Sequence, residues 1–182
     1  MQRLTITEAL AELKTLNKRI EKKWGFIQQY TLRQDRFKDP LEKQGGSFSA
    51  IQREKQSISD LSERYVNIRT AIARANDSHS ITVENTARTI SEWLYWRRDI
   101  APGQQAFLNT LFKHITGNRD KARTQGINVV AGDKETSSPT DIVVNLNEEE
   151  LQKEIERMEV ILGNLDGQLS LKNATIFVDI PE

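Results

Sequence analysis

Residues 6–27 read ITEALAELKTLNKRIEKKWGFI, and the residues of one stripe in this stretch recur at alternating steps of four and three. The stripe consists of Ile6, Leu10, Leu13, Asn17, Ile20, Trp24 and Ile27. All of its members except Asn17 are apolar. This spacing is typical of a coiled coil or a long helical hairpin, because it keeps one narrow face of a helix against a partner. The sequence therefore predicts a long helix that needs a partner along its length.

A second long helix follows and supplies a partner. Thr5 and Glu8 form a capping box that predicts the start of the first helix, which we expect to run from Ile6 to about Arg36. The second helix is predicted to open near Ser49, and its stripe contains Ile51, Ile58, Leu61, Tyr65, Ile68, Ile72 and Ala75. Two long helices joined by a short polar connection predict an antiparallel hairpin.

The rest of the chain mixes helices with short β-branched pieces. Residues 81–90 predict a small hairpin or an ordered loop, after which Thr89 and Glu92 form another capping box. The helix that begins there is expected to break or kink at residues 101–103, because they include Pro102. A further helix then carries a wide apolar stripe suited to a packed core, made of Phe107, Leu108, Leu111, Phe112 and Ile115.

The C-terminal third adds strands and a last helix. Residues 127–131, 141–146 and 174–180 predict strands of one small sheet. The last helix repeats the opening pattern, with Leu151, Ile155, Met158, Leu162, Leu165 and Leu169. We expect this helix to pack on the hairpin, within one subunit or across two. Its apolar stripe and that of the hairpin would otherwise both be exposed to water.

The predicted fold class is α+β and predominantly α, with a long antiparallel helical hairpin, further long helices and a small sheet from the C-terminal third. We expect residues 1–126 to form the hairpin and the next helices. Residues 127–182 are expected to form short strands around the last helix and to pack on the first part as one unit.

Composition excludes several classes of site. The chain has 182 residues, of which 37% are hydrophobic and 29% charged, and it contains no cysteine. It therefore has no disulfide, thiolate nucleophile or zinc–thiolate site. Residues 1–132 carry 22 basic against 14 acidic side chains, and residues 133–182 carry 4 against 12. This asymmetry reflects either ordinary solvated faces or an acidic third that lies against basic parts of the same or a neighbouring subunit.

Catalytic signatures are missing from the sequence. His79 and His114 have no partner at metal-ligand spacing, and no nucleophile elbow or glycine-rich phosphate loop is present. We therefore expect a protein that is not an enzyme and that has no metal, cofactor or small-molecule substrate. No leader sequence or apolar run of membrane-spanning length is seen, so we expect the chain in the cytosol or in a particle assembled there.

A few residues are candidates for contacts with partners. Trp93 and Trp96 lie in a cluster of aromatic and basic residues. This cluster either stacks on nucleic-acid bases or sits at a membrane interface, or its rings pack on one helix face while its arginines pair with acids or stack on aromatic rings. A nucleic-acid platform would need a more basic surface. Asn17 either fixes register and partner number or sits at an exposed edge of the stripe. The remaining candidates are Trp24, which also suits a membrane surface, and Leu151, Ile155, Leu162 and Leu169 of the last helix.

Three blocks carry a resemblance to known proteins. They are residues 10–21, residues 72–99 with the run Arg88-Thr89-Ile90-Ser91-Glu92-Trp93-Leu94, and residues 151–175 with Asn173-Ala174-Thr175 at their end. In these blocks the chain resembles the septicolysin-type family of helical proteins of bacteria and phages. Its order of elements also resembles that of accessory structural proteins of tailed bacteriophages. Neither resemblance supplies a catalytic residue.

These resemblances imply two functions. The first is a structural or assembly protein of a tailed-phage virion, assembled in the host cytoplasm, that forms homo-oligomers and contacts neighbouring coat or tail proteins. The alternative is a membrane-active protein, because the septicolysin name implies a thiol-activated membrane lesion. The absence of cysteine departs from that activity. Nucleic acid is not an expected partner, and the membrane is expected only under the alternative.

Overall fold

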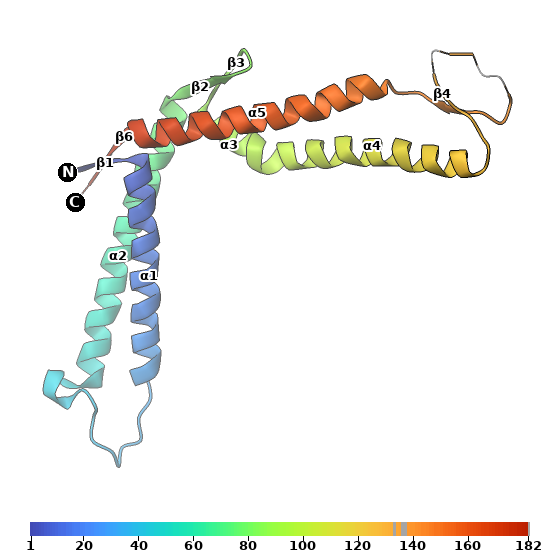
Figure 1. Cartoon of the computed structure of the whole chain (residues 1–182). Coiled ribbons are helices and arrows are strands. Elements are labelled where there is room, and N and C mark those ends of the chain that lie inside the picture. The colour runs from blue at the N-terminus through green and yellow to red at the C-terminus, as the bar shows by residue number, and fades with distance from the viewer. Residues whose placement is uncertain (133, 136–137, 182) are drawn as a thin grey trace. The chain divides into compact units, whose positions relative to one another are not determined.

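Long helices make up most of the structure, a computed structural model that describes residues 1–132, 134–135 and 138–181 (Figure 1). The helices are α1 (Ile6–Tyr30), α2 (Gly46–Ser78), α3 (Ile90–Tyr95), α4 (Ala101–Thr124) and α5 (Glu148–Thr175). The strands are β1 (Gln2–Thr5), β2 (Ser80–Val83), β3 (Thr86–Thr89), β4 (Val129–Ala131), β5 (Ile142–Val144) and β6 (Phe177–Ile180). The predicted class, predominantly α with small sheets, is confirmed.

The chain divides into two compact units. Unit 1 comprises Met1–His79 and Ser170–Glu182, and unit 2 comprises Ser80–Leu169. The sequence had placed a boundary between residues 126 and 127 instead. In the structure the first unit is discontinuous in sequence, because the end of the chain returns to its beginning.

In unit 1, α1 and α2 form the predicted antiparallel hairpin, but the buried stripe of α1 is not the predicted one. The buried residues of α1 are Ile6, Ala9, Leu13, Leu16 and Ile20. Asn17 and Trp24 are exposed. Of the two interpretations of Asn17, the structure matches the one that puts it at an exposed edge of the stripe. The predicted and the observed stripes share three residues. The observed stripe, which includes Ala9 and Leu16, is the face of α1 that contacts α2. In α2 the predicted stripe is confirmed, with Ile68, Ile72 and Ala75 buried.

The ends of the two helices follow local chemistry. The Thr5–Glu8 capping box is present at the start of α1, as predicted. Helix α1 ends at Tyr30, earlier than the predicted Arg36, and α2 begins at Gly46 rather than near Ser49. Gly45 precedes it with a φ of 93°, a left-handed conformation that glycine adopts without steric cost. The connection between the helices therefore starts earlier than the sequence indicated, after Tyr30, and also ends earlier, at Gly45.

A terminal ribbon closes unit 1. Strand β1 pairs antiparallel with β6, from Gln2 opposite Ile180 to Thr5 opposite Phe177. The amide of Ile6 extends this ladder by donating to the Ile176 carbonyl over 3.0 Å. The sequence predicted β6 but not β1. It also predicted one sheet for the C-terminal third, whereas the described residues form three separate two-stranded sheets.

Unit 2 begins with a β-hairpin that leads into a helix. Strands β2 and β3 pair antiparallel, and Glu84 and Asn85 between them have φ values of 44° and 66°. Positive φ at both positions is the mark of a tight type I′ turn, which matches the twist of the strands. The predicted capping box of Thr89 and Glu92 starts α3. A π-helical segment, Trp96–Ile100, joins α3 to α4. The break predicted at residues 101–103 is therefore displaced: these residues form the first turn of α4, where Pro102 is tolerated.

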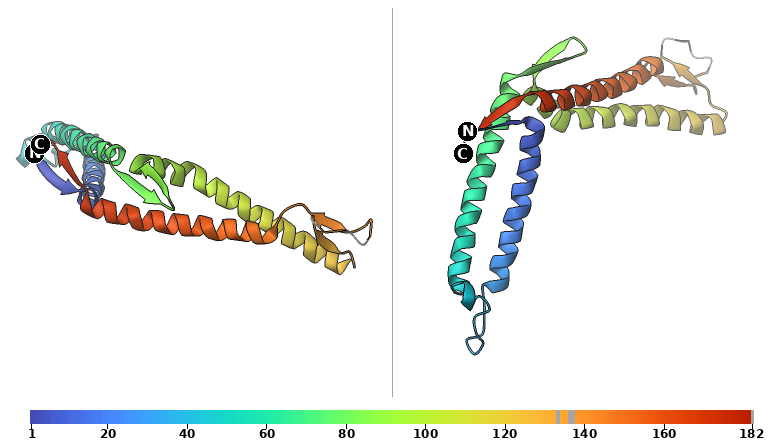
Figure 2. Two further views of the ribbon diagram at one scale, coloured as in Figure 1. Left: turned by 90° about the horizontal axis from the view of Figure 1, so that it is seen from above. Right: turned by 60° about the vertical axis from the view of Figure 1, so that its left-hand side comes forward.

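Helices α4 and α5 lie side by side and run antiparallel in unit 2 (Figures 1 and 2). Helix α4 ends in a Schellman motif, in which Ile127 donates to Ala122 and the left-handed Gly126 donates to Arg123. Asn147 caps α5 by accepting from the amides of residues 149 and 150. Within unit 2 the first turns of α5 lie against α4, and residues 170–175 at the end of α5 belong to unit 1 with the hairpin.

Candidate interaction surfaces

The tryptophan cluster is a packing element of unit 2. Trp93 is buried, with 4% of its surface exposed, and its indole Nε1 donates to the Ile81 carbonyl over 3.2 Å. The Trp96 ring meets it edge-on at 5.5 Å, and the Arg88 guanidinium lies 5.0 Å from the centre of the Trp93 ring. These contacts fasten the β2–β3 hairpin to α3. Trp93, a candidate contact residue, is therefore part of the core and is not available to a partner.

The arginines that follow the tryptophans are paired with carboxylates. Arg97 lies 2.9 Å from Asp166 of α5, and Arg98 lies 2.7 Å from Asp99. Hydrogen bonds from Arg98 lower the pKa of the Asp99 carboxyl below its ordinary value. Of the two interpretations of this cluster, the structure matches the one in which its aromatic rings pack and its arginines are paired.

The candidate residues of α5 lie on its inner face. Leu151 and Leu169 are buried, and Ile155 and Leu162 are half-buried. The predicted stripe of α5 is thus confirmed as a packing surface. It is incompletely covered in its middle, where Ile155 and Leu162 keep part of their surface in water.

A groove between α4 and α5 lies beside this partly covered region. The α4–α5 groove has a volume of ≈ 370 Å³ and is lined by Gln104, Phe107, Leu108, Glu154, Arg157, Met158 and Ile161. Phe107 is 62% exposed although the sequence assigned it to the core. Leu108 and Leu111 are half-buried, and Ile115 is buried. Phe107 lies one turn before Leu111 and shares its side of the helix, so helical spacing alone does not set it apart.

Ion pairs hold α4 and α5 together on either side of the groove. Arg97 with Asp166 lies toward one end of the helix pair, and Arg119 with Glu148 lies toward the other. Arg119 donates hydrogen bonds to the Glu148 carboxylate, and these bonds raise the pKa of Arg119 above its ordinary value. Arg157, which lines the groove, also pairs with Glu84 of the β2–β3 turn at 2.9 Å. The walls of the groove are therefore fixed by charged contacts, and its floor is apolar.

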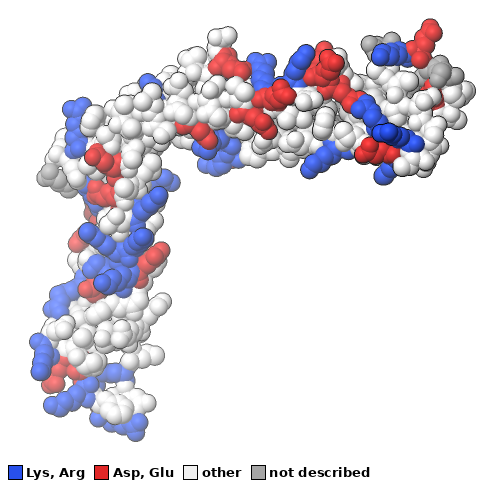
Figure 3. Space-filling model, viewed as in Figure 1, with Lys and Arg blue, Asp and Glu red and all other residues white. Residues whose placement is uncertain are grey.

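The connection between α1 and α2 presents a second apolar surface. The hairpin tip (residues 31–48) exposes Leu32 to 88%, Phe37 to 58% and Phe48 to 78%. Its basic side chains are Arg33, Arg36, Lys38 and Lys43, and its acidic side chains are Asp35, Asp39 and Glu42. Figure 3 shows that blue predominates over red at this end of the hairpin. The sequence pointed to neither the tip nor its phenylalanines.

The tip is ordered by one carboxylate. Asp39 accepts hydrogen bonds from the Ser47 hydroxyl at 2.5 Å, the Ser47 amide at 2.8 Å and the Leu41 amide at 2.8 Å. The bonds from Ser47 and then Leu41 lower the pKa of Asp39 below its ordinary value. Leu41 is buried beneath the loop. The exposed apolar side chains are thus displayed by a structured loop.

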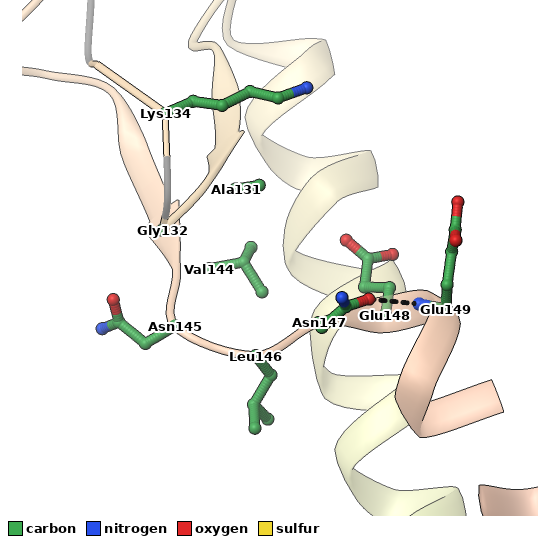
Figure 4. A pocket seen from close by; sticks show the side chains of 9 residues that line it. All are labelled: Ala131, Gly132, Lys134, Val144, Asn145, Leu146, Asn147, Glu148 and Glu149. Carbon is green, nitrogen blue, oxygen red and sulfur yellow. Dashed lines mark hydrogen bonds between the residues drawn. The ribbon is translucent and has the colours of Figure 1, made fainter. Parts of the chain in front are cut away.

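Two other hollows lie over the described residues. A pocket of ≈ 700 Å³ lies at the start of α5, between β4, β5 and the capping residue Asn147 (Figure 4). In that view Asn147 is turned to the backbone of Glu149, while Lys134 and Asn145 point in different directions. A hollow of ≈ 590 Å³ in unit 1 lies against β6 and includes His79, whose ring binds the Ala75 carbonyl. Over the described ranges, no three acidic or histidine side chains group as metal ligands.

The surface of the chain is large for its mass. The chain exposes 13002 Å². Two separate compact proteins, each of half this mass, would together expose about 10,800 Å². The chain therefore exposes roughly 2,200 Å² more than two such proteins. Within the part of the chain that is described, no helix is both long and apolar enough to cross a membrane.

Comparison with known proteins shows a likeness of fold. No protein-family model matches the chain. No curated protein matches it either. Among solved structures, it is similar to the crystal structure of a functionally unknown conserved protein from Corynebacterium diphtheriae, with a TM-score of 0.50 and 15% sequence identity. The match covers 98% of this chain and 100% of that one. At this identity the likeness shows a shared fold, which extends over nearly the whole chain.

Proposed function

We propose that the protein is a non-enzymatic structural or assembly subunit that works by self-association and by contacts with neighbouring proteins. The observation that carries the proposal is the surface of the chain, which is roughly 2,200 Å² larger than that of two compact proteins of half its mass. Apolar side chains on this surface include Phe107 on α4 and the phenylalanines of the hairpin tip. Association covers such surface, because burial of apolar area is its main driving force.

The proposed setting is the virion of a tailed phage, assembled in the host cytoplasm. This setting rests on the sequence resemblance to accessory structural proteins of tailed phages. Electron microscopy of the particle from which the protein comes is the direct test. Density for repeated copies of the helical hairpin in the particle is expected, and a particle without the protein contradicts this setting.

Self-association is tested by light scattering coupled to size-exclusion chromatography, with sedimentation at 1 to 100 µM. We expect a molar mass that is a multiple of the chain mass of 20.9 kDa and that falls on dilution. A monomer at every concentration contradicts self-association. The charged surface makes ionic strength a second variable, so the series is run at low and high salt.

The second candidate function is membrane activity, and the hairpin tip is the observation that favours it. Exposed Leu32, Phe37 and Phe48 beside four basic residues suit the interface of an anionic bilayer. Dye release from phosphatidylserine vesicles tests this function, with Phe37→Ser/Phe48→Ser as the variant. Leakage that depends on both side chains supports membrane activity, and the absence of leakage removes it.

A further inference from the structure

We propose that the α4–α5 groove receives the same surface of a second copy. Two α4–α5 pairs then close into a four-helix bundle around a two-fold axis that runs along the helices. This inference rests on the proposed self-association and names the surface that performs it.

The first argument is that α4 and α5 form a single layer. Stable domains bury their apolar faces between two layers, and two antiparallel helices supply only one. Around the groove Phe107 is 62% exposed, and Leu108, Met158 and Ile161 are half-buried. A second pair of helices is the smallest addition that covers these side chains.

The second argument is area. A stable interface of standard size buries about 800 Å² on each partner. The chain exposes roughly 2,200 Å² more than two compact proteins of half its mass. This excess is larger than the area that one standard interface buries on each partner.

The third argument is charge, and it selects the axis. Helix α4 carries four basic residues against one acidic residue, all between Lys113 and Arg123. The first turns of α5, residues 148–159, carry six glutamates against Lys153 and Arg157. A two-fold axis along the helices places α4 of one copy against α5 of the other. Because α4 and α5 run antiparallel, the basic C-terminal half of α4 then lies beside the acidic N-terminal half of α5. An axis perpendicular to the helices places α4 on α4 and forgoes this attraction.

The arrangement makes a specific pairing. In the groove, Phe107 of α4 lies at the same level as Met158 and Ile161 of α5, because all three line it. The two-fold axis along the helices keeps that level, so Phe107 meets Met158 of the partner subunit. Because the axis is two-fold, the contact occurs twice: Phe107 of each copy meets Met158 of the other.

Cysteine crosslinking tests this pairing, because the chain has no cysteine of its own. The full-length variants Phe107→Cys and Met158→Cys are prepared separately, mixed and oxidised with copper phenanthroline. We expect a disulfide-linked dimer in the mixture and little in either variant alone. Mixing Val66→Cys with Met158→Cys is the control, because Val66 is similarly exposed, at 59% against 62% for Phe107, but lies on α2 of unit 1, and it should give no dimer.

A side-chain deletion supplies the second measurement. Phe107→Gln removes the exposed ring and should raise the dimer dissociation constant at least about tenfold, as expected for a buried aromatic anchor. Phe107→Leu keeps an apolar side chain and should retain most of the affinity. Val66→Gln is the matched control, because Val66 is an exposed apolar residue outside the groove and the hairpin tip, and it should leave the dissociation constant unchanged. Far-UV circular dichroism of each variant confirms that its helix content is retained.

The outcomes separate this inference from the function on which it rests. A monomer at all concentrations overturns both. An oligomer that is insensitive to Phe107→Gln and gives no mixed disulfide overturns the bundle and leaves self-association standing. A monomer that binds phospholipid vesicles only when Phe107 is present makes a lipid surface the occupant of the groove and overturns the bundle.

Discussion

Ile68 on α2 is the place to test the core of unit 1, because none of its surface is exposed. Ile68→Ala removes three carbon atoms, each worth about 0.8 kcal/mol on burial, and leaves a cavity that adds to the loss. Alanine gives back about 0.4 kcal/mol through its better helix propensity. The expected loss in the free energy of unfolding is therefore about 3 kcal/mol, and Ile68→Val should lose about 1 kcal/mol.

Urea unfolding followed by far-UV circular dichroism measures these losses at one fixed protein concentration, because association contributes to the measured stability. Val66→Ala is the control, since Val66 is 59% exposed on the same helix. It should be neutral or stabilising by up to about 0.5 kcal/mol. Hydrogen exchange should show the loss of protection in Met1–His79 and Ser170–Glu182. A cost for Ile68→Ala equal to that of Val66→Ala, or an equal loss of protection throughout Ser80–Leu169, would refute the reasoning.

Four further variants test local features. Thr89→Ala should cost about 1 kcal/mol as a lost N-cap. Hydrogen bonds from Thr89 lower the pKa of Glu92, so they contribute to the stability of the fold above the ordinary pKa of Glu92, and this contribution is lost as the pH falls. The stability of Thr89→Ala should therefore change less on acidification than that of the parent. Thermal unfolding between pH 3 and 7 measures this difference. Trp93→Phe should cost about 2 kcal/mol in urea unfolding, since it removes buried area and an indole hydrogen bond, and a neutral result would contradict its burial. Asn17→Leu should leave oligomer mass by light scattering unchanged because Asn17 is exposed. Gly126→Ala should lower the melting temperature, because φ is +70° there and strain of about 1 kcal/mol remains although no atom obstructs a Cβ.

Local signals in the sequence predicted local structure well. The capping boxes at Thr5 and Thr89 and the cap at Asn147 all start helices in the structure. Each is a set of hydrogen bonds between residues at most three positions apart, so the sequence itself contains both partners. The stripes of α2 and α5 were also predicted, because each offers one dominant apolar face.

Features decided by distant contacts were harder to predict. Helix α1 offers two overlapping apolar stripes, one with Leu10 and Asn17 and one with Ala9 and Leu16, and only its packing against α2 distinguishes them. Strand β1 has no alternating pattern of its own and is a strand because β6 pairs with it. The same holds for the two units, whose boundary depends on the return of residues 170–182 to the start of the chain.

For the candidate surface, the sequence identified the helices but not the exposed residues. The stripe that includes Leu108, Leu111 and Phe112 was assigned to a packed core, which presumes that enough other elements surround α4. In unit 2, α5 covers one side of α4 and Phe107 remains 62% exposed. How many neighbours a helix has is a property of the tertiary structure, so no pattern within α4 reveals it.

The β1–β6 ribbon has a consequence for the order in which the two units fold. The helical hairpin and the whole of unit 2 lie between its two strands in the sequence, so their pairing closes a very long loop. Unit 2 is continuous in sequence, and the β2–β3 hairpin within it is joined by a two-residue turn. Because local contacts form faster than distant ones, we expect β2 and β3 to gain protection from hydrogen exchange before β1 and β6 do during refolding.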